Sequence, residues 1–154
     1  LAIPLYEKIG ALKKQPLAIL LGIGSGVLAS VGTIWLMSRL FSLTLEQYIT
    51  LLPKSITTAI GMDLSDTLGG MANVTVACII LTGIFGNLVA SGFLKLCRVT
   101  DPIAVGLAIG TSSHAVGTAR ARELGKTQEA MSSLSIAVAG LMTVVAASIF
   151  AMIY

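Results

Sequence analysis

Two short polar stretches carry most of the side chains in this sequence that could do chemistry. Residues 54–58 read KSITT, and residues 110–125 read GTSSHAVGTARARELG, which holds the only histidine. Hydroxyl groups can donate hydrogen bonds to an anion, and an imidazole takes up a proton near neutral pH. A lone histidine without a spaced cysteine or carboxylate is a weak sign of a metal centre or a nucleophile. The pattern therefore favours anion binding over enzyme chemistry, with no metal or cofactor.

The remainder of the chain is apolar. Hydrophobic residues make up 55% of the 154 residues, charged residues make up 11%, and the mean hydropathy is +0.93. Because a soluble domain carries about 25% charged residues, we expect lipid to be the solvent for most of this chain. The net charge of +3 is small and its lysines and arginines cluster between apolar runs, which argues against nucleic acid as a partner.

Three uncharged runs are long enough to span a bilayer: residues 17–37, 71–94 and 130–154. A span needs about 20 apolar residues, and one charge at its centre costs on the order of 2.5–3.5 kcal/mol. All three runs are rich in glycine and alanine, which let helix backbones approach each other closely in lipid. We therefore expect an all-α polytopic membrane protein with three full transmembrane helices.

The segment between the first two runs reads as a helix that is broken. Thr44 and Gln47 match a capping box that opens a helix, and Pro53 interrupts that helix after about two turns. The polar stretch 54–58 follows the proline directly, and Gly61 comes soon after. The pattern predicts two short helices that meet at a polar break.

The segment between the second and third runs has the same character. Asp101 is placed to cap a helix that Gly110 would end. Thr111 or Ser112 would then cap a second helix, which stops near Gly125. Both broken segments are expected to be re-entrant, so that each enters the membrane and leaves it on the same side.

The two broken segments also align with each other at an offset of 56 residues. Four identities fall within eleven positions: Ala59 with Ala115, Gly61 with Gly117, Leu68 with Leu124 and Gly69 with Gly125. The alignment predicts an internal repeat. The alternative is a chance match in a chain of biased composition.

The basic residues give a prediction of orientation. With both segments re-entrant, eight of them fall on one face: Lys8, Lys13, Lys14, Lys95, Arg98, Arg120, Arg122 and Lys126. Only Arg39 and Lys54 lie elsewhere. The positive-inside rule makes the basic face cytoplasmic, and we expect a multi-pass protein of the cell (inner) membrane.

The two breaks together form the predicted substrate site. Secondary transporters use paired broken helices whose half-helix N-termini point at an anionic substrate. The candidate substrate-binding residues are Lys54, Ser55, Thr57, Thr58, Thr111, Ser112, Ser113, His114, Thr118 and Arg120. His114 could couple anion movement to protons, with a neutral imidazole bonded to a neighbouring helix as the alternative. In the alternative interpretation, Arg120 is only one of the basic residues of the cytoplasmic face. Lys54 would in that case extend its ammonium group to the membrane interface, which is known as snorkelling.

The motifs resemble those of the LrgB/CidB membrane protein family. The resemblance rests on LPKSITTAIGM, DPIAVGLAIG, GTSSHAVGTARARELG and AMSSLSIAVAGL, with PLYEKI near the start, and it covers nearly the whole sequence. It implies that residues 1–154 form one transmembrane domain, the C-terminal part of a longer LrgB-like protein with additional N-terminal helices. One departure is Ala59, where relatives often have proline, and it implies a less rigid first break.

The resemblance also implies two functions. Proteins of this family were described as regulators of murein hydrolase export and cell lysis, acting opposite holin-like partners. A plant plastid relative exchanges glycolate and glycerate, and some bacterial relatives are linked to pyruvate uptake. Combined with the anion-site pattern, this predicts a transporter of small carboxylates. The alternative is an antiholin-type regulator with a holin-like (LrgA/CidA-type) partner, whose glycine-rich spans make homo-oligomer contacts.

Overall fold

The computed structural model describes residues 16–154, and the regular elements in this range are helices. In chain order they are α3 (Pro16–Leu40), α4 (Leu45–Leu51), α5 (Thr58–Leu68), α6 (Ala72–Leu96), α7 (Pro102–Leu124) and α8 (Lys126–Ile153). The all-α prediction is confirmed. The predictions for Lys8, Lys13, Lys14 and the PLYEKI motif lie outside the described residues.

Helices α3, α6 and α8 are the three predicted spans, and each is long and apolar enough to cross a membrane. Their limits differ from the prediction by at most four residues. The largest difference is at α8, which begins at Lys126 because Gly125 already separates it from α7. Large apolar side chains on the outer faces of these helices are exposed, including Leu88 at 78% and Met152 at 88%. Such surfaces suit contact with lipid.

The first broken segment has the predicted form. Thr44 caps α4, and the side chains of Thr44 and Gln47 each accept a hydrogen bond from the other's backbone N–H. The helix ends at Leu51, two residues before Pro53, whose ring and missing N–H do not fit a helix interior. A turn follows, and the extended backbone of Thr57 (φ −66°, ψ 145°) begins α5.

Helix α7 begins and ends where predicted. The Asp101 carboxylate accepts a hydrogen bond from the Ala104 N–H at 2.9 Å, and Pro102 occupies the first helical position. At the other end, Gly125 has a φ of 149°, which lies in the region that favours glycine. It ends α7 and leads directly into α8.

The break inside α7 lies four residues beyond the predicted one. The prediction that Gly110 ends the first piece was wrong, and so was the prediction that Thr111 or Ser112 caps the second. The non-helical residue is His114, with φ 41° and ψ −137°. Gly110 has a different role: a Cβ atom there would collide with the backbone of Ser132, so the glycine lets α8 approach α7 closely.

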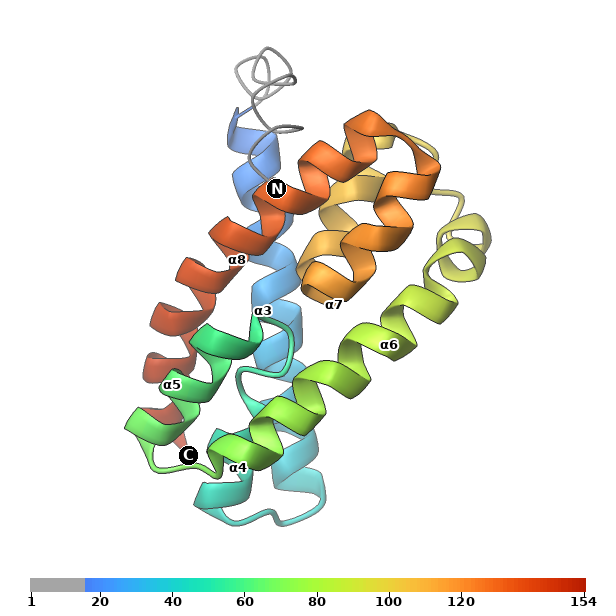
Figure 1. The fold of residues 1–154 in the computed structure, drawn as a ribbon. Coiled ribbons are helices and arrows are strands. Elements are labelled where there is room, and N and C mark those ends of the chain that lie inside the picture. Colours follow the sequence, from blue (N-terminus) through green and yellow to red (C-terminus); the bar gives the residue numbers. More distant parts are fainter. Residues whose placement is uncertain (1–15) are drawn as a thin grey trace.

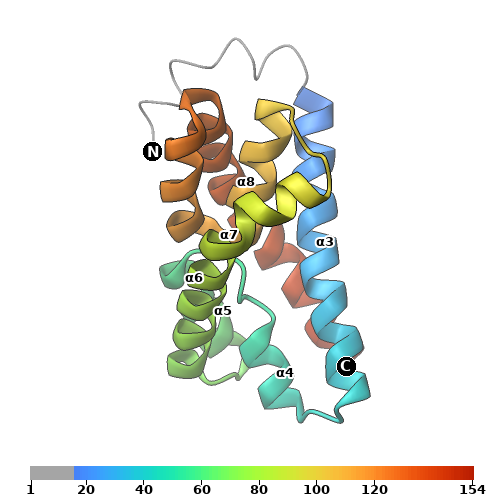
Figure 2. The same cartoon turned by 90° about the vertical axis from the view of Figure 1, so that its right-hand side faces the viewer.

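Both broken segments are hairpins that return to the end of the molecule from which they start (Figure 1). We call one end of the bundle the basic end, defined by Lys95, Arg98, Arg122 and Lys126. Helix α7 enters from the basic end, turns back near mid-height and returns to it, where α8 begins (Figures 1 and 2). The segment of α4 and α5 does the same from the opposite end, where Arg39 lies near the end of α3.

The predicted repeat extends over more of the chain than the two breaks. At an offset of 56 residues, α3 (Pro16–Leu40) coincides with α6 (Ala72–Leu96) at both limits, and the end of α5 coincides with the end of α7. Helix α3 runs away from the basic end and α6 runs toward it, so the two copies are inverted (Figure 1). Pro53 aligns with Ile109 at this offset, and the absence of a proline there explains why the first piece of α7 continues to the break.

Backbone details repeat at the same offset. Ser42 and Arg98, each two residues past a long helix, have φ values of 51° and 55°. The N–H of Leu43 donates to Ser38, and the N–H of Val99 donates to Leu94 in the corresponding place. Gly69 and Gly125 both have positive φ at the end of the second piece. The agreement between the two copies therefore includes their turns and caps.

The arrangement of the ends gives a testable topology. In a variant without Cys78 and Cys97, single cysteines at positions 95 and 126 should react with an impermeant maleimide from the same side of intact cells. A cysteine at position 39 should react only from the other side, because α3 ends opposite to the basic end. Permeabilised cells supply the control, since all three positions should then react. Labelling of positions 95 and 126 from different sides would contradict the re-entrant form of α7.

Candidate functional site

The first break places a lysine among hydroxyl groups. The Lys54 ammonium donates to the Ser55 hydroxyl at 3.0 Å and lies 3.5 Å from the Ser30 hydroxyl of α3. Ser30 itself donates to Ser55 at 3.1 Å. The Lys54 side chain is half-buried, and the ion pairs found within residues 16–154 do not include it. Its positive charge is therefore solvated by hydroxyl groups and has no carboxylate counterion among the described residues.

The position of Ser30 fixes the depth of this lysine. At 1.5 Å per residue, Ser30 lies about 21 Å from the start of α3 and about 15 Å from its end. The Lys54 ammonium therefore points into the bundle near the middle of a membrane-length helix. This geometry argues against the alternative that Lys54 snorkels to an interface.

Helix α5 begins four residues after Lys54, and its first N–H groups have no partner inside the helix. The side chain of Thr57 makes no capping hydrogen bond, and the first intrahelical bond joins the N–H of Gly61 to the Thr57 carbonyl. The N–H groups of residues 58–60 are thus left without a partner inside the helix. Thr58 and Ala59 are exposed, and alanine keeps an N–H that proline would remove. The helix dipole favours an anion here by about 0.3–1 kcal/mol, and by up to about 2 kcal/mol when partly buried.

The second break is accommodated by glycines of the neighbouring helices. A Cβ atom at Gly26 would lie 2.6 Å from the Thr111 methyl group. On α6, Gly86 makes room for Ser113 and Gly83 makes room for His114. These glycines were expected only to let helix backbones approach each other. They also admit the polar side chains of the break into the bundle.

His114 is buried and held by α6. The side chain is 3% exposed, and its Nε2 lies 2.9 Å from the Ile79 carbonyl, to which a protonated Nε2 donates. Asn87 of α6 also donates from Nδ2 to the Val116 carbonyl at 2.9 Å, just past the break. The backbone conformation of His114 costs on the order of 1–3 kcal/mol, so these contacts from α6 are needed to maintain it.

The other hydroxyls of the second break differ in their surroundings. Thr111 is buried, and its Oγ1 has no hydrogen-bond partner within the described residues. Ser112 is exposed and donates to the Ala108 carbonyl at 2.8 Å, with the Ser113 hydroxyl 3.0 Å away. A buried hydroxyl without a partner is rare in proteins, and it leaves Thr111 free to bind a ligand or water.

Helices α3 and α6 bring the two breaks together. Gly26 and Ser30 are one turn apart on α3, about 6 Å along its axis. Gly26 contacts Thr111 of the second break, and Ser30 contacts Lys54 of the first break. On α6, the carbonyl of Ile79 is hydrogen-bonded to His114, and the side chain of Ile79 packs against Gly61 of α5. The two breaks thus share the same two neighbouring helices.

Two predicted site residues follow the second break toward the basic end. Thr118 donates to the His114 carbonyl at 3.1 Å, and its hydroxyl lies 2.7 Å from that of Ser132 on α8. Arg120 lies further toward the basic end, where it donates from Nε to Ser91 at 2.9 Å and pairs with Glu123. Thr118 therefore braces the second piece of α7 against α8, and Arg120 belongs to a separate pocket.

Three contributors to the site were not among the predicted residues: Ser30, the carbonyl of Ile79, and Asn87. Ser30 and Asn87 are polar residues inside uncharged spans, a signal that often marks contacts between membrane helices. A backbone carbonyl has no signal in the sequence. Within residues 16–154, histidine, cysteine and carboxylate side chains form no group of three that could hold a metal ion.

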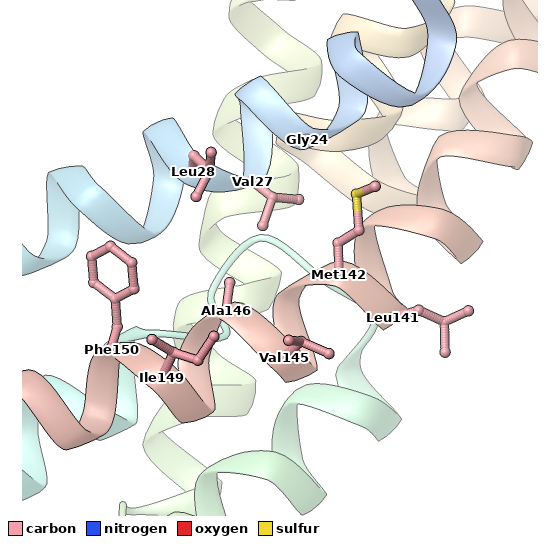
Figure 3. A pocket seen from close by; sticks show the side chains of 9 residues that line it. All are labelled: Gly24, Val27, Leu28, Leu141, Met142, Val145, Ala146, Ile149 and Phe150. Carbon is pink, nitrogen blue, oxygen red and sulfur yellow. The ribbon is translucent and has the colours of Figure 1, made fainter. Parts of the chain in front are cut away.

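One apolar groove is unsuited to a carboxylate. It lies between α3 and α8, has a volume of 520 Å³, and is lined by carbon and sulfur atoms of side chains (Figure 3). The lining residues are Gly24, Val27, Leu28, Leu141, Met142, Val145, Ala146, Ile149 and Phe150. An anion would lose its hydration there and gain no hydrogen bond from a side chain.

Comparison with known proteins places the chain in a family. No solved structure was found to match it. The model of the LrgB-like family matches residues 1–153, which is essentially the whole chain and agrees with the motifs at the two breaks. Three helices within residues 16–154 are also long and apolar enough to cross a membrane. The chain therefore belongs to the LrgB-like family and is a membrane protein.

Proposed function

We propose that this protein transports small carboxylates of the glycolate, glycerate or pyruvate type across the cell membrane, and that it binds the anion at the two helix breaks. The observation that carries the proposal is Lys54, a cation near mid-span whose described partners are hydroxyl groups. A charged residue inside a membrane helix bundle is costly and generally marks a substrate or ion pathway.

The groups around Lys54 suit a carboxylate. A bound carboxylate would pair with the ammonium, and such a charge-assisted hydrogen bond is roughly twice as strong as a neutral one. The free N–H groups at the start of α5 would add further donors. The hydroxyls of Ser30, Ser55 and Thr57 remain for the 2-hydroxyl or 2-oxo group of such substrates.

The inverted repeat supports transport over a purely structural role. Secondary transporters commonly contain inverted repeats, with the substrate site at broken helices near the midplane. Rocking of one repeat against the other can then expose that site to each side in turn. The hairpins of this chain enter from opposite ends and share α3 and α6 as neighbours, which is the arrangement that such a cycle requires.

The direct test is saturable exchange of small carboxylates by the purified protein in liposomes. Cys78 provides a second measurement, because its thiol is half-buried and the next residue, Ile79, contacts both broken segments. In a Cys97→Ala background, a charged thiol reagent should modify Cys78, and saturating substrate should slow the reaction. No exchange and no protection by any small carboxylate would refute the proposal and favour the regulatory alternative.

His114 is proposed to couple transport to protons. No hydrogen bond occupies its Nδ1 within the described residues, and the groups of α6 that face the ring are the Ile79 carbonyl and Gly83, both uncharged. In His114→Gln, the amide can still donate to Ile79, so exchange should stay within about twofold of wild type. A gradient of one pH unit supplies about 1.4 kcal/mol, which drives a tenfold accumulation of substrate when one proton is coupled. His114→Gln should lose this pH-driven accumulation.

Both assays of His114→Gln are made in the same liposomes, between about pH 5 and 8, where imidazole titrates. His114→Ala serves as the matched variant, since it removes the bond to Ile79 as well as the titration. Equal losses in exchange and in pH-driven uptake by His114→Gln would indicate a structural role. No loss in either assay would exclude His114 from coupling.

A further inference from the structure

A second polar pocket lies at the basic end, apart from the two breaks. It has a volume of 270 Å³ and is lined by residues from the end of α6, the link to α7, both pieces of α7 and the start of α8. Its polar lining comes from Ser91, Lys95, Arg120 and Gln128. This pocket takes no part in the proposed binding of a carboxylate at the breaks.

The pocket carries a positive charge that is only partly compensated. Arg120 uses Nε to bond Ser91 and Nη1 to pair with Glu123, which leaves its Nη2 without a partner in the described part of the chain. Lys95 is exposed and takes part in no ion pair found within residues 16–154. Glu123 therefore offsets the charge of Arg120 alone, and the remaining donors can hold an anion.

The apolar lining indicates which kind of anion fits. Leu94 and Val105 are 8% and 6% exposed, and both contribute to the pocket next to the cations. A free inorganic anion gains nothing from such a wall, whereas a phospholipid matches a cationic rim with its phosphate and an apolar wall with its glycerol and acyl carbons. Basic pockets between membrane helices near the end of a span are a known setting for phospholipid headgroups.

We propose that this pocket binds the phosphodiester headgroup of an anionic membrane phospholipid. Arg120 and Lys95 contact the phosphate, and the side chains of Ser91 and Gln128 supply further hydrogen bonds. Because Arg120 extends from the piece of α7 that follows His114, the bound lipid ties this piece to the end of α6. The site is independent of the substrate breaks and is tested without transport.

The experiment measures lipid binding to the purified full chain in neutral detergent. Native mass spectrometry counts bound molecules during titration with phosphatidylglycerol, with phosphatidylcholine, or with phosphatidylglycerol in the presence of inorganic phosphate. One basic residue near a membrane surface contributes about 1 kcal/mol, or about fivefold in affinity for an anionic lipid. We expect Lys95→Gln and Arg120→Gln each to weaken phosphatidylglycerol binding about fivefold, and Glu123→Gln to strengthen it.

Lys126→Gln is the matched control, because Lys126 is an exposed cation at the same end that does not line the pocket. It should bind phosphatidylglycerol like the wild type. If Arg120→Gln does not fold, Lys95→Gln and Glu123→Gln still test the proposal, because they change the net charge at the pocket in opposite directions. Equal affinity for phosphatidylcholine, or equal weakening by Lys126→Gln, would overturn the proposal. Displacement of the lipid by millimolar phosphate would identify a site for soluble anions and would also overturn it.

Discussion

Replacing Lys54 by methionine is expected to reduce carboxylate exchange at least about 30-fold while leaving the protein folded. Truncating one partner of a buried, hydrogen-bonded charge pair costs 2–5 kcal/mol or more, and about 1.4 kcal/mol corresponds to a factor of ten. Methionine has a similar length and removes only the charge and its hydrogen bonds. Ser30 and Ser55 remain bonded to each other at 3.1 Å, so the variant leaves no orphaned hydroxyl.

Thermal unfolding separates the two roles that Lys54 could have. A charge inside a membrane bundle destabilises the empty protein, so Lys54→Met should unfold at the same temperature as the wild type or at a higher one. Lys54→Arg keeps the charge and should retain part of the exchange. Lys126→Met, at an exposed position of the basic end, is the control for loss of a cation. Exchange by Lys54→Met within threefold of wild type would show that the substrate does not use this lysine.

The second large effect is expected at Gly110, where leucine should destabilise the protein by about 3 kcal/mol. A Cβ atom at this position would collide with the Ser132 carbonyl and the Ser135 hydroxyl, and the Cα of Ser132 would be 2.8 Å away. Neighbouring backbone cannot move aside as a flexible side chain can. Overpacking costs typically 1–3 kcal/mol and occasionally more. For 150–250 residues, a loss of about 3 kcal/mol lowers Tm by about 6–12 °C.

Gly32→Leu provides the matched control for this substitution. Gly32 lies on α3, and a Cβ atom there would meet nothing within 4 Å. Both variants gain the same intrinsic helix propensity, about 1 kcal/mol, so the difference in their Tm reports the contact with α8 alone. Equal Tm values for Gly110→Leu and Gly32→Leu, measured in the same detergent, would contradict the close packing of α7 on α8.

Most of the fold could be predicted because it follows from local features. Uncharged runs of about 20 residues predict spans in any context, and the caps at Thr44 and Asp101 are local hydrogen-bond patterns. The break in α7 was misplaced because glycine has two meanings in a membrane helix. At Gly110 the glycine makes room for α8, and the contacts that hold the break at His114 come from α6. Such tertiary contacts are not visible in a local pattern.

The candidate site could be predicted only in part for a related reason. Hydroxyls and charges beside a break are visible in the sequence, so Lys54 and Ser55 were found together. A serine inside an uncharged span indicates a helix contact, but it does not say that the contact is with the first break, which Ser30 makes because α3 passes beside it. Arg120 was assigned to the same site, although the helix carries it to the basic end, beside Ser91. Arg120 follows His114 by six residues, about 9 Å along the helix, and this distance places it outside the break.

The inverted arrangement of the repeat has a consequence for how such a protein can originate. One unit consists of a long helix that crosses the bundle and a hairpin that returns to the end it left, so the chain changes ends an odd number of times in each unit. A tandem copy of an odd unit starts on the other side and is automatically upside down. A single duplication in one reading frame, without any new orientation signal, is therefore enough to create two facing hairpins. A unit with an even number of crossings would have placed both hairpins on the same side.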